Sequence, residues 1–166
     1  LPRGTISLFQ RSEGAPTILF VELQNLEAGA NPWHVHALPV PQGASAGGPT
    51  LNRVTSGYVD GDCAGTAGHF NPTLYPSAAV GTAEYGDLTA KHGNLVEAAY
   101  QGVLEDTTLP LFGDDSVLGR SIVIHRAVGG GRWACANIGP PGLGMQIDFT
   151  ASSPPPVPGQ VYPVAP

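Results

Sequence analysis

Two histidines, His34 and His36, are separated by a single residue in the sequence. Side chains alternate between the two faces of a β-strand, so on a strand both imidazoles point to one face while Trp33 and Val35 point to the other. Two imidazoles held on a rigid strand suit copper, zinc or nickel. Because the same pair also fits two solvated histidines on an edge strand, it predicts a metal site only if further ligands join it.

Three further histidines are available, at His69, His92 and His125. His69 lies in a predicted loop, and His125 ends an apolar strand on its less apolar face. If these two converge on the first pair, four imidazoles form one site, and such all-nitrogen ligation suits Cu(II). His92 could be a fifth ligand, a zinc ligand or, as we favour, a histidine that organises its loop.

Short apolar segments separated by turn residues must position these histidines. We expect strands over residues 4–10, 17–26, 33–40, 95–104, 120–125, 132–138 and 145–150, and a short extended segment over residues 107–112. About eight short strands without a helical period predict an all-β sandwich or barrel. A loop as long as residues 41–68 usually has a function or a tether.

The composition narrows the class of protein. A length of 166 residues is enough for one domain with a hydrophobic core. The 23 Gly, 17 Pro and 12% charged residues favour strands, turns and loops over helices. The formal net charge of -6 argues against nucleic acid or an anionic membrane surface as a partner. The sequence shows no membrane span and no signal peptide and does not begin with Met, which we interpret as a mature or excised form.

Two cysteines, Cys63 and Cys135, lie far apart in the sequence. They fit either two buried free thiols or one disulfide. The low charge and the Pro-rich end of the chain favour a secreted protein, in which a disulfide is expected. Residues 152–166 have the composition of an extended linker that could lead to another domain. We therefore predict one β domain over residues 1–151 and a Pro-rich linker or tail over residues 152–166.

Six short motifs carry most of these residues. They are Trp33-His34-Val35-His36, Cys63, Gly68-His69-Phe70-Asn71-Pro72, Gly86-Asp87-Leu88, Gly119-Arg120-Ser121-Ile122-Val123-Ile124-His125 and Arg132-Trp133-Ala134-Cys135. In this order, over about residues 4–139, they resemble the copper-zinc superoxide dismutases and, more closely, their copper-only relatives and superoxide dismutase-like repeat domains.

The resemblance implies a Greek-key β-barrel or sandwich of about eight antiparallel strands with long loops. It implies one copper ion per chain as the cofactor, held by His34, His36, His69 and His125. Arg132 would guide superoxide to the copper. A disulfide between Cys63 and Cys135 would tether the long loop and indirectly place Arg132.

Two departures from the family pattern point to the copper-only class. Zinc-containing members bind zinc through three histidines and one aspartate. Here Asp87 matches the aspartate and His69 the bridging histidine, but Ser77 and Glu84 stand at the other two positions. This set is incomplete for tetrahedral zinc, so no zinc is expected. Only six residues connect the last copper ligand to the arginine, where zinc-containing enzymes carry a long charged loop.

Glu84 is predicted to take over one role of zinc. Without zinc, the second ring nitrogen of His69 needs a partner that fixes its tautomer and raises its basicity. A carboxylate can accept that hydrogen bond, so we expect Glu84 to orient His69 and to take part in catalysis with His69 and Arg132. The alternative is an ordinary solvated loop glutamate. Asp87 is expected to bond to loop backbone or to a histidine.

The first strand of the family has no counterpart, because only three residues precede the strand predicted at 4–10. We expect residues 145–150 to fill the vacant position and to cover the exposed edge. Otherwise that strand comes from a neighbouring domain or is missing from this form.

The resemblance implies an extracellular or cell-surface, copper-dependent superoxide dismutase without zinc, which converts superoxide to dioxygen and hydrogen peroxide. Adjacent repeat domains are possible partners, because superoxide dismutase-like domains occur in tandem. A non-catalytic copper-binding or spacer module and a copper-delivery domain are the alternatives. The complete ligand set and Arg132 favour catalysis.

Overall fold

A computed structural model of the chain describes residues 2–41, 62–72, 83–139 and 145–148. The strands are β1 (Arg3–Gln10), β2 (Thr17–Gln24), β3 (Ala30–Asn31), β4 (Trp33–His36), β5 (Leu95–Val96), β6 (Ala99–Asp106), β7 (Ser121–His125), β8 (Arg132–Asn137) and β9 (Met145–Asp148). The described helices are the 3-10 helix η1 (Asp62–Thr66) and the short α-helix α2 (Leu88–His92). The predicted all-β class with antiparallel pairing is confirmed.

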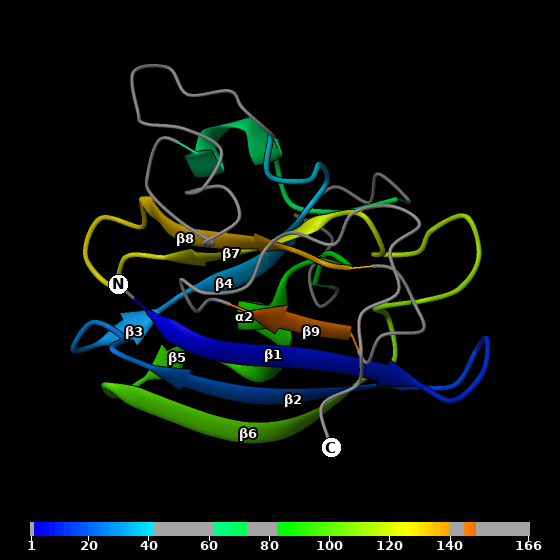
Figure 1. Ribbon diagram of the computed structural model, residues 1–166, viewed down its shortest axis with the longest axis horizontal. Coiled ribbons are helices and arrows are strands. Elements are labelled where there is room, and N and C mark those ends of the chain that lie inside the picture. The colour runs from blue at the N-terminus through cyan, green and yellow to red at the C-terminus, as the bar shows by residue number, and fades with distance from the viewer. Residues whose placement is uncertain (1, 42–61, 73–82, 140–144, 149–166) are drawn as a thin grey trace.

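The strands form two main layers. One is a four-stranded sheet in the order β6-β2-β1-β9, and the other is a three-stranded sheet in the order β4-β7-β8. Figure 1 shows β4, β7 and β8 above β1, β2 and β6, with α2 drawn between the two groups. A small pair, β3 with β5, lies at one end.

The edge of β1 is covered as the sequence predicted. Strand β9 pairs with β1 in antiparallel register, with Ile147 opposite Ile6 and Asp148 opposite Thr5. An unpaired strand edge would present a row of open backbone donors and acceptors, so this pairing removes one such edge. Residues 149–150, which complete the predicted segment, lie outside the described residues.

The core fills the space between the layers. Alternate residues of β1 and β2, such as Ile6, Leu19 and Leu23, are almost completely buried. They join Ile122 and Ile124 of β7 in one apolar cluster. Burying a side chain of this size stabilises the fold by about 1.5–3 kcal/mol. Trp133, which follows Arg132 on the next strand, belongs to the same cluster.

The predicted strand at 33–40 is too long. Strand β4 ends at His36, because the next two backbone N–H groups bond to the loop instead of to a strand: Ala37 donates to the carbonyl of Gly68, and Leu38 to that of Thr66. Pro39 and Pro41 then prevent further pairing.

The predicted strand at 95–104 is interrupted. Glu97 adopts a φ of 71°, and this left-handed residue separates β5 from β6. Residues 107–112 form no strand. They are held by side chains, since the hydroxyl of Thr17 donates to the carbonyl of Leu109 and the amide N–H of Leu111 donates to Gln10 Oε1.

Helix α2 was not predicted. Five residues are too few for a helical period to show in the sequence, and the helix depends on a cap, because Asp87 Oδ1 accepts a hydrogen bond from the backbone N–H of Ala90. Among the described residues the strands form separate sheets and do not close into a barrel. The predicted domain boundary at residue 151 and the tail lie outside the described residues.

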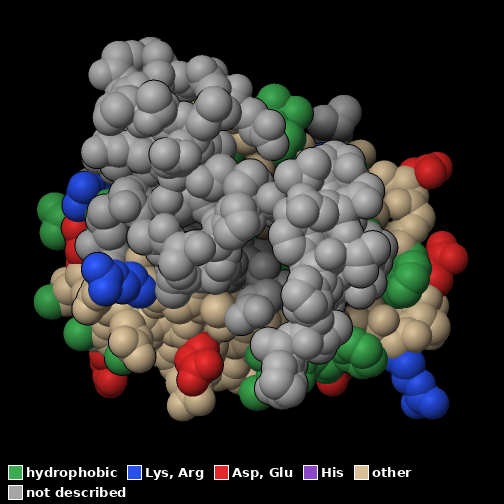
Figure 2. All heavy atoms as spheres, in the orientation of Figure 1, with side chains coloured by type: hydrophobic (Ala, Val, Ile, Leu, Met, Phe, Trp, Pro, Cys, Tyr) green, Lys and Arg blue, Asp and Glu red, His purple; other side chains and the backbone are tan. Residues whose placement is uncertain are grey.

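Charged side chains are scattered over the described part of the face shown in Figure 2, where no large patch of Lys and Arg appears. Within the described residues, no helix is long and apolar enough to cross a membrane.

Candidate metal centre

Four histidines from three segments meet at one place. His34 and His36 come from β4, His125 ends β7, and His69 lies in the loop that follows η1. One ring nitrogen from each lies within 4.8 Å of those of the others. Figure 1 shows β4 and β7 side by side, and their register sets His34 opposite Val123 and Trp33 opposite Ile124.

The strand geometry explains why the rings converge. On β4, Trp33 and Val35 join the apolar core, so the alternating His34 and His36 point to the opposite face. His69 reaches the same face because it forms an isolated antiparallel bridge with His36.

Backbone carbonyls fix the rings of His36 and His125. His36 Nδ1 lies 2.8 Å from the carbonyl oxygen of Ala67, and His125 Nδ1 lies 2.8 Å from that of Gly130. A carbonyl can only accept, so each Nδ1 carries the proton and donates it. The lone pair of each ring is therefore on Nε2, and both Nε2 atoms are buried without a hydrogen-bond partner among the described residues.

His34 and His69 have carboxylates as neighbours instead. His69 Nδ1 lies 2.7 Å from Glu84 Oε2, which leaves the lone pair on His69 Nε2. His34 Nε2 lies 3.5 Å from Asp87 Oδ1, whereas His34 Nδ1 is buried and has no described partner. Three buried, unpartnered nitrogens and a fourth lone pair fit a nitrogen-ligated transition metal, since an unpaired buried polar atom is otherwise costly.

The rings are held in the form that binds a metal. Burial, reinforced by the other histidines, lowers the pKa of His34 to about 3. Burial likewise lowers the pKa of His36 to about 4, against the hydrogen bond to Ala67, and burial also lowers the pKa of His125. These three rings are therefore neutral near pH 7, and a neutral imidazole is the metal-binding species.

A second cluster shares His69 with the first. It consists of His69, Glu84 and Asp87, with one possible ligand atom from each within 4.8 Å of the others. Hydrogen bonds already occupy this cluster, because Glu84 bonds to His69 and Asp87 caps α2. Ser77, the fourth predicted position, lies outside the described residues.

The predicted disulfide between Cys63 and Cys135 is present and joins η1 to β8. Arg132, at the start of β8, bonds to the same segment: its Nη1 atom lies 2.9 Å from the carbonyl oxygens of both Cys63 and Ala64. Its Nη2 atom donates to the carbonyl of Ala67, which also accepts from His36. The tethered segment thus orients the arginine, as expected.

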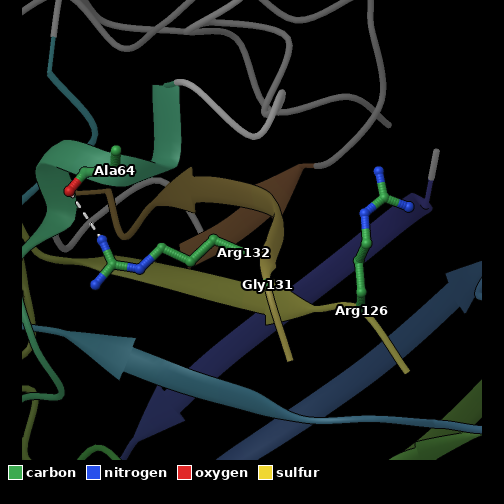
Figure 3. Close-up of a pocket in the computed structure, with 4 residues that line it drawn as sticks. All are labelled: Ala64, Arg126, Gly131 and Arg132. Carbon is green, nitrogen blue, oxygen red and sulfur yellow. Dashed lines mark hydrogen bonds between the residues drawn. The ribbon is translucent and has the colours of Figure 1, made fainter. Parts of the chain in front are cut away.

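Arg132 borders an open pocket of about 510 Å³, lined by Ala64, Arg126, Gly131 and Arg132. Figure 3 shows the Arg132 side chain extended towards Ala64, while Arg126 points away from it. The positive charge of Arg132 acts on the histidine cluster, since it contributes to the lowered pKa of His36 and His125.

Some residues around the site were not identified from the sequence. The carbonyls of Ala67 and Gly130 orient two rings, and backbone carbonyls carry no sequence signal. His92 lies outside the cluster and bonds to Asp106, with 2.9 Å between His92 Nε2 and Asp106 Oδ2. Lys91, which is half-buried, forms an ion pair with the buried carboxylate of Asp106.

Comparisons with known proteins agree with this geometry. The family model described as copper/zinc superoxide dismutase matches residues 2–138. The chain is 33% identical over 141 residues to the cell surface Cu-only superoxide dismutase 5 of Candida albicans, covering 81% of this chain and 54% of that protein. It is 30% identical to the cell surface superoxide dismutase [Cu-Zn] 4 of the same organism, covering 81% and 53%.

Solved structures give the same result. The Cu(II) form of Candida albicans superoxide dismutase 5 matches with a TM-score of 0.62 and 32% identity, covering 82% of this chain and 80% of that chain. The chain spans about half the length of the two Candida proteins it matches. The sequence motifs, the fold and the matches agree, and the chain belongs to the copper/zinc superoxide dismutase family.

Proposed function

We propose that this protein is a copper-dependent superoxide dismutase that acts outside the cell or at its surface and uses no zinc. The observation that carries the proposal is the set of four convergent imidazoles, three of which have buried nitrogens without a described partner. Two relatives are named as cell-surface superoxide dismutases, one of them Cu-only, which supports both the metal and the location.

The residues that would hold copper are His34 through Nδ1 and His36, His69 and His125 through Nε2. When bound, copper supplies the alternating one-electron reduction and oxidation that dismutation requires. The chain supplies a rigid site, because strand pairing fixes three of the rings and the bridge to His36 fixes the fourth.

Arg132 attracts the substrate. Superoxide is an anion and the chain has a formal net charge of -6, so the global field opposes its approach. A guanidinium at the mouth of the site reverses this locally. Its hydrogen bonds to Cys63 and Ala64 keep the charge beside the pocket without neutralising it, because both partners are carbonyl oxygens.

Glu84 holds a proton on His69. Its carboxylate accepts from Nδ1 at 2.7 Å, which selects the tautomer with the lone pair on Nε2 and makes that nitrogen more basic. Asp87 is placed similarly beside His34. Two observations support the proposal that this second cluster binds no zinc. Hydrogen bonds already engage its carboxylates, and the fourth position holds Ser77, whereas structural zinc is bound by cysteine, histidine or a carboxylate.

A non-catalytic copper-binding module in a longer extracellular protein is the second candidate. The Pro-rich composition of residues 152–166 favours it, since such a segment suits a linker between domains. Within either function we propose that residues 1–151 form the Greek-key domain and that residues 152–166 are the linker or tail.

The deciding experiment is an assay of the copper-loaded protein for superoxide dismutation with and without cyanide, beside a His125→Ala control. Cyanide-sensitive activity that the control lacks supports the enzyme. Tight copper binding without turnover would leave only the binding module.

A further inference from the structure

A triad formed by the buried carboxylate of Asp106 and the half-buried side chains of Lys91 and His92 lies where α2 ends. The Asp106 side chain is only 1% exposed, and its Oδ2 atom lies 2.6 Å from Lys91 Nζ and 2.9 Å from His92 Nε2. The other carboxylate oxygen, Oδ1, accepts from the backbone N–H of Thr108 at 2.8 Å and contacts its hydroxyl at 3.1 Å. Both oxygens of this carboxylate are therefore paired.

Lys91 is equally well paired. Its Nζ contacts Asp106, the carbonyl oxygen of Tyr85 at 2.6 Å and the hydroxyl of Thr108 at 3.1 Å, which matches the three protons of an ammonium group. Charges buried in this way stabilise a fold no better than apolar residues of similar size. The triad is therefore better explained by what it positions than by stability.

The hydrogen bond from Lys91 Nζ to the carbonyl oxygen of Tyr85 joins the two ends of the segment 85–91. Tyr85 directly follows Glu84, the carboxylate that bonds to His69. Asp87 lies within this segment, where it caps α2, and its Oδ1 atom lies 3.5 Å from His34 Nε2. Both carboxylates that face copper-ligand candidates are thus tied to one short segment.

The same segment is fixed to the histidine-bearing elements by its backbone. Gly86 donates to the carbonyl of Phe70 at 2.7 Å and accepts from the N–H of Val35 at 2.8 Å. A Cβ at this glycine would lie 2.3 Å from Val35 O, so the approach requires glycine. The hydroxyl of Thr89 adds a bond from the N–H of Trp33 at 2.7 Å. A change at the triad therefore reaches the carboxylates and, through Gly86, the loop of His69.

We propose that Lys91, Asp106 and His92 are positioning residues of the copper centre, which hold Glu84 against His69 and Asp87 against His34 without a second metal ion. The role in copper chemistry rests on the proposed function. The positioning itself concerns hydrogen bonds of the metal-free chain.

The test compares Lys91→Met with Ile6→Ala. The first removes the ammonium at nearly constant length, and the second destabilises the core from β1, in the other sheet. In the metal-free protein, proton NMR follows the His69 Nδ1 proton that Glu84 accepts. In the copper-loaded protein, the Cu(II) electron paramagnetic resonance spectrum reports ligand geometry. Thr108→Val, which removes one hydroxyl from the triad, is the milder variant if Lys91→Met does not fold.

We expect the His69 proton to exchange with water about tenfold faster in Lys91→Met and less so in Thr108→Val, with Ile6→Ala unchanged. The copper hyperfine splitting should shift in Lys91→Met in the direction seen in Glu84→Gln. Triad variants that match Ile6→Ala or the natural protein in both readouts would overturn the proposal. A wild-type protein that binds copper without turnover would contradict the proposed dismutase alone, because the proton measurement needs no copper.

Discussion

Two clusters share His69 and differ in what their atoms lack. In the histidine cluster, three ring nitrogens are buried without a described partner. In the neighbouring cluster of His69, Glu84 and Asp87, the carboxylates already accept hydrogen bonds: Glu84 from the His69 ring and Asp87 from a backbone N–H at the start of α2. The unpaired nitrogens of the first cluster stay costly until a cation binds, whereas both carboxylates of the second already have hydrogen-bond partners.

The difference supports our proposal that one half of a two-metal site serves in this chain as a support for the other. A zinc ion fixes the ligands around it through its own coordination. Here hydrogen bonds and the triad around Asp106 hold the corresponding segment. The metal-binding potential of a cluster thus depends on which atoms are unpaired, not only on how many ligand types gather.

The largest expected effect comes from breaking the first cluster. His125→Ala removes one of four ligands from the end of β7, so copper affinity should fall by more than about 100-fold, as for loss of a strong metal ligand. Competition with a chelator of known affinity measures this change. His92→Gln changes a positioning residue instead of a ligand, so this variant should still bind one copper per chain with a far smaller loss of affinity. Equal loss in both variants would contradict the separation of the two sets of histidines.

The lowered pKa values predict acid sensitivity of the metal-free protein. In the unfolded chain, histidines become protonated as the pH falls below about 6.5. In the folded chain, His34 and His36 stay neutral until the pH approaches their lowered pKa values of about 3 and about 4. Protons therefore favour the unfolded state over this window. Between pH 7 and pH 5 the free energy of unfolding should decrease, by at most about 1.4 kcal/mol per ring for each pH unit below about 6.5.

Urea denaturation at the two pH values measures the decrease. His36→Gln carries no titrating ring at that position, so the slope should be smaller in this variant. A free energy of unfolding that stays constant between pH 7 and pH 5 would show that the rings are not held neutral.

Substitutions of Glu84 test the role of the second cluster. Glu84→Ala removes the acceptor of the His69 proton, and we expect turnover or copper affinity to fall by about 10–100-fold. Glu84→Gln keeps an acceptor oxygen without the charge and should lose less. Stopped-flow decay of superoxide and copper competition are the measurements. Unchanged turnover and copper retention in Glu84→Ala would reduce this residue to an ordinary loop glutamate.

Arg132 is expected to give the smallest change. Arg132→Ala should lower the second-order rate with superoxide by about tenfold and weaken its dependence on ionic strength, because the local positive charge is gone. Pulse radiolysis at two salt concentrations tests both effects. Arg132→Lys keeps the charge and should retain most of the salt dependence. If Arg132→Ala keeps the wild-type salt dependence, another charge steers the anion.

The sequence predicted the parts of the fold that follow from alternation. The strand with His34 and His36 and the strand ending at His125 lie where expected, and the pairing of β9 with β1 was anticipated from a missing strand. Strand ends were less predictable, because they depend on bonds between distant segments, such as Leu38 to Thr66. Helix α2 was missed because one capping aspartate and five residues give too weak a pattern.

The site shows the same division. Histidine motifs and their order predicted the cluster, and the chemistry of an unpaired ring nitrogen predicted a partner such as Glu84. The triad was not predictable from the sequence. Asp106 ends a strand whose other residues are exposed or half-buried, so the pattern around it does not indicate that this carboxylate is buried. Burial of a charged residue is a property of the packed structure.

Metal analysis of the purified protein, after exposure to equal concentrations of copper and zinc and removal of excess ions, tests the central claim most directly. The claim that one cluster needs an ion and the other does not predicts one copper and no zinc per chain. Zinc bound in equal amount beside the copper, or a chain that retains neither metal, would contradict it.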